Sequence, residues 1–116
     1  MRINDVQKIT GLTKKAIRLY ENKGIICISR DENGYRNYSE NDIRILKTVR
    51  ILRSAGISIS DIKLYISGVL NLSEVIEKRK AEILKESGKN SESYRICERI
   101  SDEELFEILS ARLNKK

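Results

Sequence analysis

The chain of 116 residues contains no histidine, no proline and no tryptophan, and its aromatic side chains are five tyrosines and one phenylalanine. Without histidine, general acid–base catalysis near neutral pH lacks its usual side chain. We also find no catalytic triad, no paired-carboxylate pocket and no glycine-rich phosphate loop, so we expect no enzyme activity. The lack of proline and the few aromatics fit a mostly helical chain.

Cysteine is scarce as well. Cys27 and Cys97 lie 70 positions apart, and with no histidine they cannot make a closed zinc site within one subunit. Cys27 lies in the apolar run 25–28, where we expect a small buried side chain, and we expect Cys97 to be structural. We therefore predict no metal site, no cofactor and no disulfide framework.

Long apolar runs are also missing. No stretch approaches the roughly 18 apolar residues of a membrane-spanning helix, and no basic segment followed by an apolar one marks a signal peptide at the N-terminus. We expect a cytoplasmic protein with no membrane partner. A chain of this length allows one domain plus an appendage.

Charge is present in abundance but is unevenly distributed. Residues 1–63 hold 13 basic and 7 acidic side chains, which accounts for the whole net charge of +6, and residues 64–116 hold 10 of each. A generally basic protein would spread its excess charge along the chain. The uneven distribution is typical of a surface that binds phosphate.

The basic half opens with two short helical patterns. Val6 and Ile9 repeat at helical spacing, and Gly11 ends that helix. Thr13 is a suitable N-cap for a second helix, which ends at Gly24. Three cations fall largely on one face of the second helix, opposite its apolar side chains: Lys14, Lys15 and Arg18.

This second helix is either a solvated amphipathic helix or the recognition helix of a helix-turn-helix. Its cations favour recognition of DNA in the major groove. Arg18 is the best candidate for base contact, because its planar fork can bind guanine O6 and N7 together. Lys14 and Lys15 are point charges that we assign mainly to phosphate.

A β-hairpin follows and predicts a wing. Residues 25–30 form the first strand, Asn33-Gly34 the two-residue turn and residues 35–38 the return strand. Alternation places Arg36 and Tyr38 on one side. We favour phosphate contact by this pair over core packing, and we expect Tyr35 to be the more buried of the two tyrosines.

Two capping boxes then begin a second helix pair. Ser39 with Asp42 starts a helix that ends at Gly56, and Ser58 with Asp61 starts another that stops near residue 68. Arg53 and Lys63 lie near the intervening turn, within reach of a DNA backbone. The complete set that we assign to DNA contact is Thr13, Lys14, Lys15, Arg18, Tyr20, Arg36, Tyr38, Arg53 and Lys63.

The C-terminal segment from Leu72 begins as an amphipathic helix, but residues 85–93 are polar and contain Gly88. One interpretation is a long dimerisation helix to about residue 99; the other is two shorter helices with a break near Gly88. We favour the continuous helix, because glycine costs a helix only about 1 kcal/mol and a partner can restore it. Ser101 then caps a last helix.

Apolar side chains in this segment predict a two-fold interface in an antiparallel coiled coil. The stripe is too large to leave in water on so short a chain. The residues that we assign to it are Leu72, Ile76, Ile83, Cys97, Ile100, Leu105 and Leu109. The expected fold is therefore mainly α, with a winged helix-turn-helix domain over residues 1–70, including the second helix pair, and a dimerisation unit over residues 71–116.

Residues 1–66 resemble the MerR family of bacterial transcriptional regulators in one unbroken register. The resemblance implies dimers that bind promoters with an overlong spacer and bend and untwist it, acting on RNA polymerase through the promoter. The motifs that carry it are Thr10-Gly-Leu-Thr, Ile17-Arg18, Tyr20-Glu21, Gly24-Ile25, Arg30, Asn33-Gly-Tyr-Arg, Tyr38-Ser39, Asp42, Ala55-Gly-Ile-Ser and Ile62-Lys63.

The resemblance also assigns individual roles. By position, Lys15, Arg18, Arg36 and Tyr38 match residues that contact DNA in the family, whereas Leu19 stands where many members have a second tyrosine. Metal-sensing members carry a cysteine pair after the dimerisation helix, and drug-sensing members carry a large ligand domain. This chain has neither, so the resemblance does not identify an inducing signal or show whether there is one.

Three hypotheses for function remain. The favoured one is a dimeric, sequence-specific regulator bound to double-stranded promoter DNA. The second is an excisionase-like architectural factor, although such factors usually lack the second helix pair and the long C-terminal helix. The third is a protein-interaction module that no longer binds DNA, which the basic helix and wing argue against.

Overall fold

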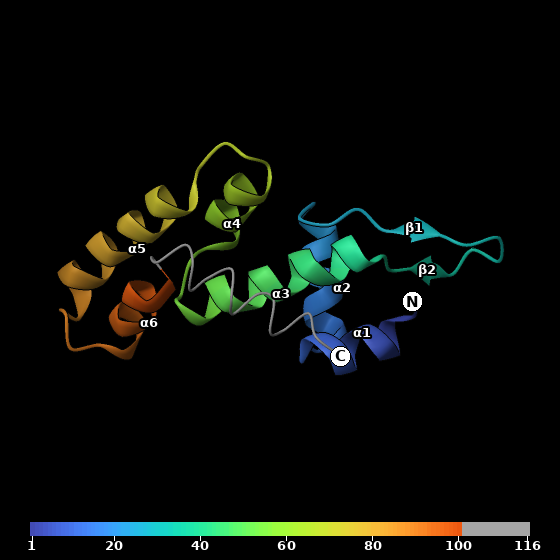
Figure 1. Ribbon diagram of the computed structural model, residues 1–116, viewed down its shortest axis with the longest axis horizontal. Helices are drawn as coiled ribbons and strands as arrows, with labels where there is room; N and C mark the ends of the chain where they lie inside the picture. Colours follow the sequence, from blue (N-terminus) through green and yellow to red (C-terminus); the bar gives the residue numbers. More distant parts are fainter. Residues whose placement is uncertain (101–116) are drawn as a thin grey trace.

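The computed structural model describes residues 1–100, and within them the chain is mainly helical with one small sheet. Figure 1 shows the wing at one end of the molecule and the last two described helices at the other. In chain order the elements are α1 (Ile3–Thr10), α2 (Lys14–Asn22), β1 (Ser29–Arg30), β2 (Arg36–Asn37), α3 (Glu40–Ser54), α4 (Ile59–Ile66), α5 (Leu72–Glu86) and α6 (Glu92–Ile100).

The predicted N-caps Thr13, Ser39 and Ser58 are confirmed, although Ser58 only accepts from Asp61 N–H and the reciprocal bond of a full capping box is not formed there. The predicted cap Ser101 lies outside the described residues. The Thr13 hydroxyl accepts from the backbone N–H of Ala16 at 3.1 Å and begins α2. Ser39 and Asp42 form the predicted capping box of α3, with each side chain accepting from the other residue's backbone N–H. These contacts satisfy amide groups that the first turn of a helix leaves unpaired.

The wing is a shorter hairpin than the sequence predicts. Pairing is limited to Ser29 with Asn37 and Arg30 with Arg36. The turn is also longer than the two residues Asn33-Gly34, because Asp31 N–H donates to Tyr35 O at 2.9 Å and so closes a three-residue loop. The Asp31 carboxylate organises that turn by accepting from the backbone N–H groups of Asn33 and Tyr35.

The core lies between the two helix pairs and continues into the C-terminal hairpin. Leu46, Val49 and Leu52 of α3 are fully buried and pack in one cluster with Val6 of α1 and Ile62 of α4. The long helix α3 thus connects the N-terminal helices to the rest of the chain. No helix within residues 1–100 is long and apolar enough to cross a membrane.

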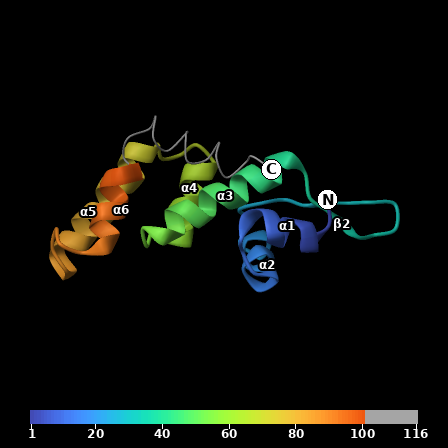
Figure 2. The ribbon, with the colours of Figure 1, turned by 60° about the horizontal axis from the view of Figure 1, so that its bottom comes forward.

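The favoured continuous dimerisation helix is wrong, and the alternative with a break near Gly88 is correct. Helix α5 ends at Glu86, and Gly88 has φ +79°, a left-handed conformation that ends the helix. The N–H groups of Ser87 and Gly88 both donate to Ile83 O, at 2.7 and 3.0 Å. Helix α6 then folds back against α5, as Figures 1 and 2 show.

This break changes the surroundings of the predicted dimer residues. Leu72, Ile76, Ile83, Cys97 and Ile100 are all at most 4% exposed in the single chain, because α5 and α6 cover each other's apolar stripe. Burial raises the pKa of the Cys97 thiol. Leu105 and Leu109 lie outside the described residues.

Two polar contacts fasten α5 to the second helix pair. Lys78 Nζ lies 3.0 Å from Asp61 Oδ1 at the start of α4. Arg79 Nε donates to Ala55 O at 2.9 Å, at the C-terminal end of α3, where a helix favours a cation. These contacts cross the predicted division at residue 70, which stays a prediction.

Candidate nucleic-acid interface

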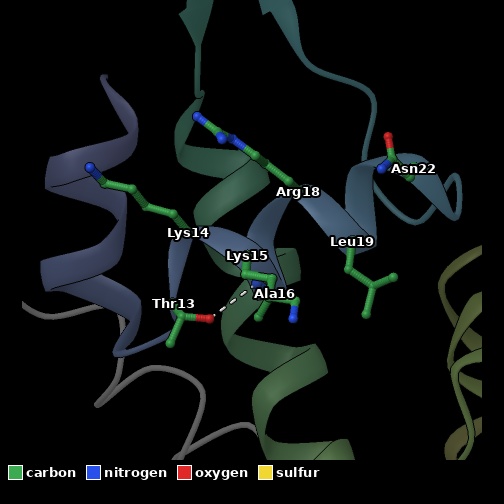
Figure 3. Close-up of a pocket in the computed structure, with 7 residues that line it drawn as sticks. All are labelled: Thr13, Lys14, Lys15, Ala16, Arg18, Leu19 and Asn22. Atoms are coloured by element: carbon green, nitrogen blue, oxygen red, sulfur yellow. Dashed lines mark hydrogen bonds between the residues drawn. The ribbon is translucent and has the colours of Figure 1, made fainter.

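Helix α2 presents one polar and basic face to solvent. Lys14, Lys15 and Arg18 are exposed there, on a broad open hollow of about 780 Å³. Figure 3 shows their side chains projecting from the helix, with Arg18 and Lys14 extending in a similar direction. The hollow is lined by Thr13, Lys14, Lys15, Ala16, Arg18, Leu19 and Asn22.

The opposite face of α2 holds the helix in place. Ile17 is 0% and Tyr20 6% exposed, and both lie in the core cluster. The assignment of Tyr20 to DNA contact is therefore corrected, because its ring packs in the interior. Its helical position, three residues after Ile17, puts it on the apolar side.

The wing is joined to α2 by an ion pair. Arg36 of β2 and Glu21 of α2 are both half-buried, and Arg36 Nε donates to both carboxylate oxygens of Glu21. A charge-assisted hydrogen bond of this kind between a guanidinium and a carboxylate restricts the position of the arginine side chain. The contact joins β2 of the wing directly to α2.

The two wing tyrosines are placed opposite to the expectation. Tyr35 is 62% exposed, whereas Tyr38 is 2% exposed. Alternation does put Tyr38 on the side of Arg36, but that side packs on the helices. The assignment of Tyr38 to DNA contact is thus corrected for the structure as it stands.

The hydroxyl of Tyr38 is buried without a hydrogen-bond partner among the described residues. Burial, followed by the nearby Glu21 carboxylate, raises the pKa of this phenol. Cys27 is also placed against expectation, since it is exposed rather than buried in its apolar run.

Sequence reasoning did not assign the cleft between the wing and the first two helices. Its volume is about 190 Å³, and four of its lining residues are arginines. Arg2 had no periodic or motif context that marked it as a DNA ligand, and Arg30 entered only as part of the family resemblance. The lining residues are Arg2, Ile3, Arg18, Arg30, Gly34, Tyr35 and Arg36.

Arg53 and Lys63 lie away from this cleft. Arg53 NH1 donates to Ile57 O at 2.6 Å and closes the turn between α3 and α4. Lys63 is exposed, and its ammonium group lies beside Gly24 at the end of α2. Of the two, only Lys63 therefore extends the basic surface of the recognition helix.

The family model described as "MerR HTH family regulatory protein" matches residues 1–69, which contain α1 to α4 and the wing. The chain belongs to the MerR family. Curated relatives agree with this membership. HTH-type transcriptional regulator CueR of Escherichia coli O157:H7 is 47% identical over 62 residues, which make up 53% of this chain and 46% of that protein.

Two further relatives extend the comparison. Heavy metal-dependent transcription regulator 2 of Rhizobium meliloti (strain 1021) is 41% identical over 64 residues, 54% of this chain and 44% of that protein. CueR of Vibrio cholerae serotype O1 (strain ATCC 39315 / El Tor Inaba N16961) is 41% identical over 64 residues, 54% and 46% of the two chains. The matches thus span somewhat less than half the length of these relatives.

Within the MerR family pattern, this chain keeps its basic residues exposed on α2 while Leu19 is 40% exposed beside them. Leucine offers no hydrogen bond to phosphate, so this position of the MerR-family surface is apolar here. Within residues 1–100, no group of three or more histidine, cysteine or acidic side chains is placed to hold a metal ion.

Proposed function

We propose that this chain is a DNA-binding transcriptional regulator, in which α2 enters the major groove and the wing grips the adjacent backbone. The single observation that carries the proposal is the basic face of α2, where Lys14, Lys15 and Arg18 project beside the wing. Membership of the MerR family supports the same function.

The exposed side chains of α2 and the wing have distinct roles in this proposal. Arg18 reads a guanine edge, because its fork can donate two parallel hydrogen bonds. Lys14 and Lys15 bind phosphate. Thr13, at the start of α2, lies where its hydroxyl can also contact the DNA backbone. Among the described residues, the Glu21 contact engages Nε of Arg36 and leaves its terminal amino groups to donate to phosphate.

The second helix pair contributes less to the surface. Lys63, beside the end of α2, adds a cation that reaches the backbone outside the recognition helix. Arg53 supports the turn at Ile57 and acts on DNA only through the position of α4. We therefore rank Lys63 above Arg53 as a phosphate ligand.

We further propose that the protein binds as a homodimer to a pseudo-palindromic promoter site. The stripe that the sequence predicts for the interface is buried within the chain, so the proposed interface uses the outward side of α5. Leu84 is 45% exposed there, and Ala81 lies one turn before it on the same side. A two-fold pair would fix two recognition helices at a set distance, so half-sites must lie about one or two helical turns apart.

Promoter distortion is the proposed mode of regulation, acting on RNA polymerase through the spacer. Wings that grip phosphate between the half-sites can hold the DNA bent at an elastic cost of a few kcal/mol. The test inserts or deletes one base pair at the centre of the operator. Transcription should then change far more than binding; regulation that follows occupancy alone would identify a simple roadblock repressor.

Footprinting locates the site and separates the alternatives. Protection of a promoter spacer is the outcome that we expect. Protection confined to a recombination attachment site would instead identify an excisionase-like architectural factor. The absence of any footprint at micromolar protein would overturn the DNA-binding proposal and favour a protein-interaction module.

A further inference from the structure

Arg2, which immediately precedes α1, lies across the wing. Its NH2 is 2.7 Å from Asp31 Oδ2, and its guanidinium carbon lies 4.8 Å from the centroid of the Tyr35 ring. Half of the Arg2 side chain nevertheless stays exposed, at 52%. The N-terminal segment therefore brings a cation to two wing residues that lie 29 and 33 positions further along the chain.

The cleft beside Arg2 is rich in guanidinium groups. Arg2 comes from the segment before α1, Arg18 from α2, and Arg30 and Arg36 from the two wing strands. Arginine forks match the geometry of phosphate oxygens better than any other side chain. A volume of about 190 Å³ exceeds several times the roughly 30 Å³ that one water takes, so it admits a phosphate group with water.

Asp31 is the acidic residue that holds Arg2, and its two oxygens have separate tasks. Oδ1 accepts from the backbone N–H groups of Asn33 and Tyr35, at 2.9 and 3.0 Å, and so shapes the turn. Oδ2 pairs with Arg2. The turn is therefore built on one oxygen, and the arginine is held by the other.

We propose that this cleft binds a backbone phosphate of DNA, and that Arg2 exchanges Asp31 for that phosphate when DNA binds. The inference rests on the proposed DNA-binding function and adds a ligand site to it. Asp31 acts as a positioning residue that holds Arg2 over Tyr35 in the free protein. In the complex the phosphate replaces the carboxylate as the partner of the guanidinium.

Two substitutions separate this proposal from a purely structural role of Arg2. Asp31→Asn keeps an oxygen for the turn but removes the charge that competes for Arg2, so DNA binding should become several-fold tighter. Arg2→Gln should weaken binding several-fold and lower the slope of log K against log salt by about 0.9, the value for one phosphate contact. If Arg2 only braces the wing, both substitutions weaken binding.

Matched controls remove the effect of net charge. Glu32→Gln changes the charge by the same amount one residue further along the exposed turn, and it should tighten binding less than Asp31→Asn. Lys89→Gln removes an exposed cation from the distant α5–α6 turn, and it should leave the salt slope unchanged. The proposal would be overturned if Glu32→Gln tightened binding as much as Asp31→Asn, or if Lys89→Gln lowered the salt slope as much as Arg2→Gln.

The contact can also be assigned to a single phosphate. A methylphosphonate, which has no charge, is placed at one backbone position at a time in the footprinted site. At one position the wild-type protein should lose affinity while Arg2→Gln loses much less; no such position would overturn the cleft. If the wild-type protein binds no DNA, the proposed function itself fails. If it binds DNA and Arg2→Gln leaves the slope of log K against log salt unchanged, only the proposed phosphate site in the cleft is wrong.

Discussion

Arg36 Nε lies 3.0 Å from Oε2 and 3.2 Å from Oε1 of Glu21, so one carboxylate of the recognition helix receives the arginine of the wing. The two residues are 15 positions apart and belong to the two elements that are proposed to meet DNA. Their contact makes the helix and the wing one surface of fixed geometry.

Glu21→Ala should therefore lower sequence discrimination. Loss of the carboxylate releases Arg36 and adds one net positive charge, so affinity for random DNA should hold or rise while specific affinity falls. The ratio of specific to random affinity is measured by competition binding and should drop about tenfold, which corresponds to about 1.4 kcal/mol. Glu32→Ala makes the same charge change on the exposed wing turn and should leave that ratio unaltered.

Arg18→Ala should change the sequence preference of DNA binding, whereas Lys15→Ala should lower the affinity for all DNA. Loss of a base-reading arginine should cost about 1 to 3 kcal/mol at one base pair and relax the preference there. Loss of a phosphate-binding lysine should weaken all sequences alike and reduce the salt slope by about 1. Binding titrations on operator and random DNA at several salt concentrations measure both, and equal losses on the two DNAs for Arg18→Ala contradict the assignment.

Gly56→Ala should destabilise the fold more than Gly68→Ala. Both glycines have positive φ, +80° and +85°, so alanine costs each about 1 to 2 kcal/mol in backbone strain. Only at Gly56 would the new Cβ meet the Arg79 guanidinium, at 2.5 Å from NH2. Displacing Arg79 breaks its hydrogen bond to Ala55 O, so urea unfolding should show about 1 kcal/mol of extra loss. In a chain that already carries Arg79→Met, Gly56→Ala should cost no more stability than Gly68→Ala, because the hydrogen bond to Ala55 O is already lost.

Lys47→Met should raise the free energy of unfolding at pH 7 by about 1 kcal/mol. Lys47 is 1% exposed, and burial lowers its pKa below the ordinary value. Between the lowered folded pKa and the ordinary unfolded pKa, the unfolded chain binds more protons, so wild-type stability rises with pH. Denaturation from pH 7 to 10 should show the advantage of Lys47→Met shrinking as pH rises. An advantage that stays constant over that range would contradict the prediction.

Leu84→Asp should shift the proposed dimer to monomer without unfolding the chain. The side chain is 45% exposed in the single chain, so an acidic group there disturbs a partner rather than the core. Sedimentation at micromolar concentration and circular dichroism measure assembly and helix content. Leu19→Asp changes a similarly exposed leucine on α2, 40% exposed, and should not affect assembly.

Local signals allowed most of the helical fold to be predicted. Thr13, Ser39 and Ser58 cap the helices that they were expected to begin, because a cap depends on residues within one turn. The sequence favoured a continuous helix through Gly88, because the residues within one turn do not decide whether the helix ends there. Whether glycine continues a helix or ends it depends on how the segments on its two sides pack, and here α6 folds back on α5.

The site was less predictable than the fold. Alternation shows that Arg36 and Tyr38 share a side of the wing, but it cannot show that this side faces the core. Arg2 stands outside any helix or strand pattern, so only the folded chain brings it to Asp31 and Tyr35. The cations of α2 were recognisable because helical spacing alone places them on one face.

The turn at Gly88 has a consequence for the proposed dimer. Because α5 and α6 bury their apolar stripe against each other, the hairpin forms from contacts that are close in sequence and do not depend on protein concentration. The apolar stripe of an obligate dimer is covered by its partner, whereas here α6 covers the stripe of α5 within one copy. Dissociation of the proposed dimer should therefore leave the α5–α6 hairpin folded.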